Sequence, residues 1–182
     1  MGLKSVVDSS SAQGVRRDDR TAFEGVVAAH QAAVYTLCRQ LLADPDEAAD
    51  VTQDVFVAAW LNLKGITGDL RAWLFKAAVN RCRDRLRRRR RLTPHPVPDR
   101  PDPAPDGRPE EALLAAERQA AVRQALLRLD PDQRLAVVLA DLFGYAYAEV
   151  AAITGWPVGT VRSRLHRGRL ALRKTLLKGP EL

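Results

Sequence analysis

This chain is poor in cysteine, methionine and aromatic residues. It has two cysteines and one methionine in 182 residues, and aromatic side chains make up only 5% of the sequence. No CxxC pair and no His/Cys cluster with metal-ligand spacing occurs, which argues against a disulfide scaffold and a zinc site. Cys38 and Cys82 each lie in an apolar stripe at helical spacing, so we expect two buried free thiols.

Signals for secretion, membrane insertion and catalysis are also missing. The sequence has no secretory signal and no apolar run of about 18 residues, so we expect a cytoplasmic protein without membrane insertion. It has no P-loop, no glycine-rich dinucleotide turn and no paired catalytic constellation. We therefore expect no enzyme activity, no cofactor and no metal, and look for function in binding.

Positive charge is concentrated in two segments. The net charge of the chain is +7. Residues 71–91 contain ten Arg or Lys and one acid, and residues 157–178 contain seven Arg or Lys and no acid. The rest of the chain is therefore net negative. Two basic segments on an otherwise acidic chain predict two surfaces that meet a polyanion.

Proline divides the chain. Seven of the eleven prolines lie in residues 92–109, which predicts an extended, flexible linker. Helical periodicity with little β signal fills residues 21–91 and 110–178. Within the second stretch, "DPDQ" at Asp130 to Gln133 predicts the N-cap and the first-turn proline of a new helix. We expect residues 1–20 to be disordered and residues 179–182 to form a tail. The predicted fold is all-α, with two small helical domains joined by a Pro-rich linker.

The C-terminal basic segment has the layout of a helix-turn-helix. "YAEVAAITGW" predicts a short helix that ends at Gly155, and "PVGTVRSRLHRGRLALRKTLLK" predicts a second helix with a core side and a cationic side. The predicted core stripe is Val158, Val161, Leu165 and Leu172. A basic helix after a tight glycine turn is typical of proteins that place this helix in the DNA major groove. A solvated surface helix and a basic tail are the alternatives.

A helix that begins near Asp44 has two unlike sides. In "DPDEAADVTQDVFVAAWLNL", Ala48, Val51, Val55 and Ala58 form the inward stripe. The other side mixes polar and apolar residues: Asp46, Asp50, Gln53, Asp54, Val57 and Leu61. A merely solvated face needs acids but has no use for exposed Val and Leu, so this pattern favours a protein-docking surface.

The helix in "RAWLFKAAVNRCRDRLRRRRR" combines a core stripe with a polar, cationic face. The core stripe is Phe75, Val79, Cys82 and Leu86. The cationic face holds Lys76, Asn80, Arg83 and Arg87, with Trp73 beside it. Cations bind phosphates, Asn can read a base edge, and Trp can stack on an unpaired base, although Trp73 fits a plain core role equally well. The preceding loop "NLKGITGD" contains Asn62 and Lys64 and could hold a nucleotide.

These motifs, in this order, resemble the sigma-70 family of bacterial RNA polymerase initiation factors, specifically the small extracytoplasmic-function (ECF) group. "EAADVTQDVFVAAW" resembles the segment that docks on the polymerase clamp helices. "RAWLFKAAVNRCRDRLRR" resembles the segment that opens and reads the −10 promoter element. The segment from Leu129 to Lys174 resembles the domain that reads the −35 element. The resemblance covers roughly residues 21–177, and it assigns sigma region 2 to residues 21–91 and region 4 to residues 110–178.

The resemblance implies a role for each matching position. Polymerase docking falls to Asp50, Gln53, Asp54, Val57 and Leu61. Contacts to the −10 element fall to Asn62, Lys64, Trp73, Lys76, Asn80, Arg83 and Arg87. Contacts to the −35 element fall to Thr160, Arg162, Ser163, Arg164, His166, Arg167 and Arg169.

The implied partners are core RNA polymerase, through the clamp helices of its largest subunit and the flap of the second largest, promoter DNA and an anti-sigma factor. Two departures are Ala49, where the family often has an acid, and the unusually Pro-rich linker. A free-standing helix-turn-helix regulator is the alternative, although it would not need the mixed stripe of Asp50 to Leu61. An enzyme acting on nucleic acid would need a catalytic cluster that the sequence lacks.

Overall fold

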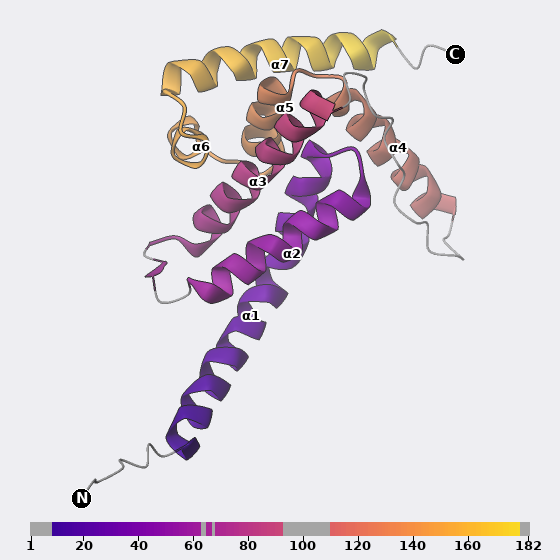
Figure 1. Cartoon of the computed structure of the whole chain (residues 1–182). Helices are drawn as coiled ribbons and strands as arrows, with labels where there is room; N and C mark the ends of the chain where they lie inside the picture. Colours follow the sequence, from indigo (N-terminus) through magenta and orange to yellow (C-terminus); the bar gives the residue numbers. More distant parts are fainter. Residues whose placement is uncertain (1–8, 63–64, 67, 93–109, 179–182) are drawn as a thin grey trace, which may run out of the picture.

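The computed structural model describes residues 9–62, 65–66, 68–92 and 110–178, and all of its regular elements are helical. No strand occurs among these residues, which confirms the predicted all-α class. The N-terminal domain consists of α1 (Ser9–Leu41), α2 (Pro45–Leu61) and α3 (Leu70–Leu92) (Figure 1). The C-terminal domain consists of α4 (Glu110–Leu127), α5 (Pro131–Val137), the π-helix η2 (Val138–Leu142), α6 (Tyr147–Thr154) and α7 (Val158–Lys178).

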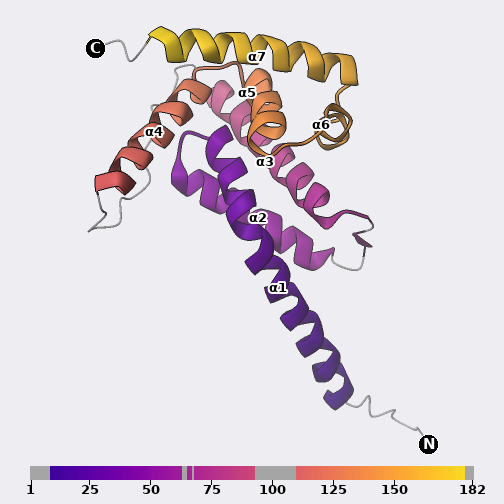
Figure 2. The ribbon, with the colours of Figure 1, turned by 180° about the vertical axis from the view of Figure 1, so that it is seen from behind.

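Helix α1 begins earlier than the sequence analysis expected. Residues 1–20 were predicted to be disordered, whereas the helix already covers Ser9 to Arg20. No proline interrupts these residues, so helix α1, which is packed in the core from Val34 to Leu41, can continue toward its N-terminus. Its N-terminal half projects beyond α2 and α3 (Figures 1 and 2). The predicted linker lies almost entirely outside the described residues, so its flexibility stays a prediction.

Two Asp-Pro pairs start helices: one starts α2, which carries the predicted docking residues, and the other starts α5, which packs against α7. A side-chain oxygen of Asp44 accepts hydrogen bonds from the backbone N–H groups of Asp46 and Glu47, at 2.8 and 3.4 Å. Asp130 caps α5 in the same way. In both helices proline occupies the first turn, where its missing N–H has no cost. The predicted starts of these two helices are therefore confirmed.

Most residues of the predicted apolar stripes are buried in the core. In α2 and α3, Val51, Val55, Phe75 and Val79 are fully buried. In α7 the stripe holds at Val161 and Leu165 but not at Val158, which is exposed because it lies in the first turn, ahead of the crossing with α5.

The two cysteines are buried and free, as predicted. A hydrogen bond from Cys82 lowers the pKa of Cys38. The same bond, together with burial, raises the pKa of Cys82. The thiols therefore meet inside the N-terminal domain, between α1 and α3, although they lie far apart in the sequence.

The two domains pack against each other and share one hydrophobic core. Helix α3 lies beside α6, and α1 contacts α4 and α5 (Figures 1 and 2). The buried guanidinium of Arg134 on α5 donates a 2.7 Å hydrogen bond to the carbonyl of Leu41, at the C-terminus of α1. Carbonyls in the last turn of a helix lack hydrogen-bond donors within the helix, and Arg134 supplies the missing donor to one of them from the other domain. The sequence pattern predicts two tethered modules but not this contact.

Candidate polymerase and nucleic-acid interfaces

The predicted docking residues lie together on the outer side of α2. Asp50, Gln53 and Asp54 are exposed, while the adjacent Val51 and Val55 are buried. Val57 is 51% exposed and Leu61 is 75% exposed. Arg85 of α3 approaches Asp50 at 4.0 Å, a weak surface pair that leaves the carboxylate accessible. The structure thus brings all five predicted docking residues onto one accessible stripe of mixed chemistry.

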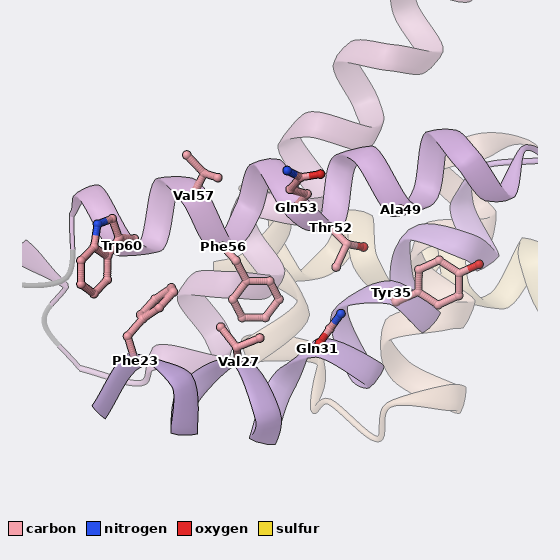
Figure 3. Close-up of a pocket in the computed structure, with 10 residues that line it drawn as sticks. All are labelled: Phe23, Val27, Gln31, Tyr35, Ala49, Thr52, Gln53, Phe56, Val57 and Trp60. Atoms are coloured by element: carbon pink, nitrogen blue, oxygen red, sulfur yellow. The ribbon is translucent and has the colours of Figure 1, made fainter. Parts of the chain in front are cut away.

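Beside this stripe, α1 and α2 enclose an apolar groove of about 710 Å³ (Figure 3). Phe23 and Trp60 close one end with their rings edge to face and their centroids 5.1 Å apart. The residues that line the groove are Phe23, Val27, Gln31, Tyr35, Ala49, Thr52, Gln53, Phe56, Val57 and Trp60. Gln53 and Val57 belong to both the stripe and the groove, so the two form one continuous surface.

The predicted −10 face of α3 is only partly free. Lys76, Asn80 and Arg87 are exposed. Arg87 pairs with Asp84 one turn earlier, at 2.6 Å between nitrogen and oxygen. Trp73 is half-buried against the core, which fits the structural reading of this residue better than a free stacking surface.

The loop before α3 is described only in part. Asn62 ends α2, and its side-chain amide donates a hydrogen bond to the carbonyl of Ala58 at 2.8 Å. Gly68 has a φ of +85°, a conformation that suits glycine. Lys64 lies outside the described residues, so its predicted DNA contact stays a prediction.

Arg83 differs from the other predicted −10 residues because it faces the C-terminal domain. Its guanidinium donates a 2.9 Å hydrogen bond to the carbonyl of Thr154 at the end of α6. The guanidinium carbon also lies 4.7 Å from the ring centroid of Trp156, in cation–π geometry. Burial lowers the pKa of Arg83 from its ordinary value. In this structure Arg83 is therefore engaged within the chain.

Helices α6 and α7 form the predicted helix-turn-helix. Helix α6 ends at Gly155, whose φ of +74° places it in the left-handed conformation that closes many helices. The Ala146 N–H at the start of α6 donates a 2.7 Å hydrogen bond to the Glu149 carboxylate. Val150, Ile153, Val161 and Leu165 are buried between the helices and α5, which fixes their mutual angle.

The predicted −35 residues of α7 fall into two groups. Arg162, His166 and Arg167 are exposed on the outer face, and Ser163 among them donates to the Thr160 carbonyl at 3.0 Å. Arg164 instead pairs with Asp132 at 2.8 Å and lies over the Trp156 ring at 3.9 Å.

Arg169 makes two hydrogen bonds to Asp141, at 3.0 and 2.5 Å, and these bonds raise its pKa. Arg164 and Arg169 thus have carboxylate partners inside the domain. Arg162, His166 and Arg167 are better placed to meet a ligand.

Sequence reasoning missed Trp156, Arg71 and Tyr145, which lie where the two domains meet. Arg71 of α3 lies over the Tyr145 ring at 5.4 Å from its centroid. No local pattern could have singled out these residues, because their partners are distant in the sequence. The apolar groove was missed as well, since four of its ten lining residues come from α1, where no docking residue was predicted.

Within the described part of the chain, no group of three or more His, Cys, Asp and Glu side chains is arranged to hold a metal ion. Nor do any of the described helices combine the length and apolar character that crossing a membrane requires. The chemistry present is that of binding surfaces: an acidic and apolar stripe on α2 and two sets of cations on α3 and α7.

Comparison with known proteins agrees with this arrangement. Residues 26–92 match the model of sigma-70 region 2, and residues 119–172 match that of sigma-70 region 4. The chain is 31% identical to the ECF RNA polymerase sigma factor SigW of Bacillus subtilis, over 89% of this chain and 92% of that protein. It is 36% identical to SigE of Mycolicibacterium smegmatis, over 86% of this chain but only 62% of that relative.

A solved structure shares the fold of both domains. It is the sigma factor RpoE from Bartonella quintana in complex with the anti-sigma factor NepR, with a TM-score of 0.70 and 27% identity. The match covers 88% of this chain and 99% of that one. With both sigma-70 regions present in order, and with relatives of matching length, this chain belongs to the ECF group of the sigma-70 family of RNA polymerase sigma factors.

Proposed function

We propose that this protein binds core RNA polymerase through the α2 stripe, reads the −10 element with α3 and reads the −35 element with α7. As an ECF sigma factor it directs polymerase to promoters, and the residue roles are the proposal. The single observation that carries it is the exposed stripe of Asp50, Gln53, Asp54, Val57 and Leu61. A free-standing DNA-binding regulator would have no need of such a surface.

Docking would use both the acidic and the apolar residues of the stripe. The clamp helices of the largest polymerase subunit would meet the carboxylates of Asp50 and Asp54, and apolar side chains of the partner would cover Val57 and Leu61. Interfaces of this kind combine an apolar centre with a polar rim. The C-terminal domain would contact the flap of the second-largest subunit.

Promoter reading divides between the two cationic faces. On α7, Arg162, His166 and Arg167 are exposed and would enter the major groove at the −35 element, where Arg pairs with guanine edges. On α3, Lys76 and Arg87 would hold phosphates of the melted strand, while Asn80 would contact a −10 base. The polymerase makes the bonds, and the sigma factor supplies affinity for the unstacked bases rather than enzymatic chemistry.

The cellular setting follows from this role. Work at promoters places the protein in the cytoplasm, and neither a metal nor a cofactor is needed for it. The similar RpoE structure contains a bound anti-sigma factor. An anti-sigma factor is therefore a proposed partner here as well, with the α2 stripe and its groove as the surface it would cover.

The test is a charge reversal on α2. We expect Asp54→Arg to weaken binding to core polymerase at least about tenfold, roughly 1.4 kcal/mol, because a cation would replace an acid at the interface. Competition with a labelled sigma factor for limiting core enzyme measures this affinity. Glu117→Arg, which reverses an exposed acid on α4, is the charge-matched control. Equal affinity of the two variants, with wild-type circular dichroism, would reject docking through α2.

A further inference from the structure

Helices α1 and α4 contact each other and enclose a polar pocket of about 490 Å³ (Figure 2). Each helix contributes residues at the spacing i, i+1, i+4 and i+5, which begin at Tyr35 on α1 and at Arg118 on α4. Residues at this spacing share one face of a helix, so one face of each helix lines the pocket. None of the residues predicted to dock on polymerase or to contact promoter DNA belongs to this lining.

The charge in this pocket is of one sign. Among the described residues, three arginines and no acid line it: Arg39 of α1, and Arg118 and Arg123 of α4. Arg39 is only 3% exposed, and its guanidinium donates to the carbonyls of Leu42 and Ala43 at 3.2 and 3.1 Å. These neutral acceptors orient the guanidinium without cancelling its charge. A concave site with low-dielectric walls concentrates the field of such charges and favours an anion.

Arginine is the side chain that suits phosphate best. Its planar guanidinium donates two parallel hydrogen bonds to a pair of phosphate oxygens. Arg118 is exposed, and it makes no hydrogen bond or ion pair within the part of the chain that the structure describes. Its donors are therefore available to a ligand at the mouth of the pocket, while Arg39 lies deeper.

The rest of the lining suits the organic part of a phosphorylated ligand. Val122 and Leu142 are 44% and 52% exposed, so they offer apolar surface to a flat ring. The side-chain oxygen of Gln40 is buried and has no hydrogen-bond donor among the described residues. Such an acceptor costs about 1–3 kcal/mol, and turning the amide toward an N–H of a ligand would remove that cost. The volume lies within the range of about 300–1,000 Å³ that small-molecule sites occupy.

We propose that this pocket binds a nucleoside triphosphate. Arg39, Arg118 and Arg123 hold the phosphates, and the base lies against Val122 and Leu142. Duplex DNA is the other polyanion that arginines meet, but the buried position of Arg39 favours a small group that can enter the pocket over the backbone of a duplex. The site goes beyond the proposed function, because it uses none of the docking or promoter residues.

Two variants test the site at exposed positions, where the fold is not at risk. Arg118→Gln removes one cation from the pocket, and Val122→Glu places an acid inside it. Each has a charge-matched control that lies outside the lining: Arg128→Gln removes an exposed cation just after α4, and Ala121→Glu adds an acid at the exposed position beside Val122.

Equilibrium dialysis of radiolabelled ATP against the full-length protein measures the affinity directly. Salt at about 0.15 M screens exposed charges that lie more than about 8 Å apart, so general attraction to a basic chain is suppressed. We expect one ATP per chain in the wild type. The dissociation constant should rise about three- to tenfold in Arg118→Gln, which loses one charge-assisted contact, and more than about tenfold in Val122→Glu. Both controls should stay within about twofold of wild type, and circular dichroism should be unchanged in all four variants.

The outcomes decide between the ligands. Weaker ATP binding in the two pocket variants and not in their controls supports the site. Absent or non-saturable binding to the wild type, or equal losses in Arg118→Gln and Arg128→Gln, overturns it. Inorganic tripolyphosphate that bound as tightly as ATP would overturn the assignment to a nucleotide. If Val122→Glu weakened the binding of duplex DNA but not of ATP, the pocket would be a DNA contact and the proposal would be wrong.

Discussion

Gly168 lies where α7, the helix proposed to read the −35 element, crosses α5. Replacing it with alanine tests how closely these two helices pack. The residue lies in the middle of α7 and is buried against α5. A Cβ at this position would lie 2.8 Å from a methyl carbon of Val137 and 3.0 Å from the backbone oxygen of Gln133. Neither neighbour is the end of a long flexible side chain, so α7 must move away from α5.

Two opposing effects determine how much the free energy of unfolding changes. Alanine is favoured over glycine in a helix by about 1 kcal/mol. Forcing an extra carbon into a well-packed contact costs about 1–3 kcal/mol. Since one clash is with backbone, we expect the upper part of that range. The free energy of unfolding should therefore fall by about 1–2 kcal/mol in Gly168→Ala.

Gly159→Ala is the matched control, because Gly159 is in the same helix and a Cβ there would meet nothing within 4 Å. We expect this variant to unfold at the same or a higher urea concentration than wild type. Urea titration followed by circular dichroism measures both. If Gly168→Ala were as stable as Gly159→Ala, the close approach of α7 to α5 would be wrong.

Three further predictions concern individual side chains. Arg162→Ala should weaken promoter binding by about 1–3 kcal/mol and so lower initiation at −35-dependent promoters, measured on a set of promoters with different −35 sequences. If the variant matched wild type on every one of these promoters, Arg162 would not be part of the DNA interface. Asn80→Ala should change which −10 base the holoenzyme prefers when it binds single-stranded oligonucleotides, whereas Lys76→Ala should weaken binding to every sequence alike. An unchanged base preference in Asn80→Ala would mean that Asn80 has a structural role. Cys38 and Cys82 should resist a thiol reagent until denaturant is added, because both are buried, and rapid labelling of the native protein would contradict this.

Local patterns in the sequence were enough to predict the helices and most of their faces. The Asp-Pro starts of α2 and α5 and the buried stripe through Val51 and Val55 follow from capping chemistry and from a 3.6-residue period. The exposure of Val57 and Leu61 was predicted by the same period, since they fall opposite the core stripe. Each of these features depends on residues within a few turns of one another.

What could not be predicted depends on residues far apart in the chain. Arg83 and Thr154 are separated by 71 positions, and nothing near Arg83 distinguishes it from the other arginines of α3. The ion pairs that engage Arg164 and Arg169 are formed with acids on α5 and η2, so the spacing within α7 could not reveal them. Periodicity shows which face of a helix is polar but not which partner meets that face.

The most direct test of promoter recognition is transcription of genomic fragments by core polymerase with and without this protein, with the RNA 5′ ends mapped. We predict a new set of 5′ ends that appear only with the protein and share sequence elements near −10 and −35. The set should shrink with Asp54→Arg, which lowers docking. A 5′-end pattern identical to that of core enzyme alone, from a protein that still binds duplex DNA by itself, would contradict the account and favour a free-standing helix-turn-helix regulator.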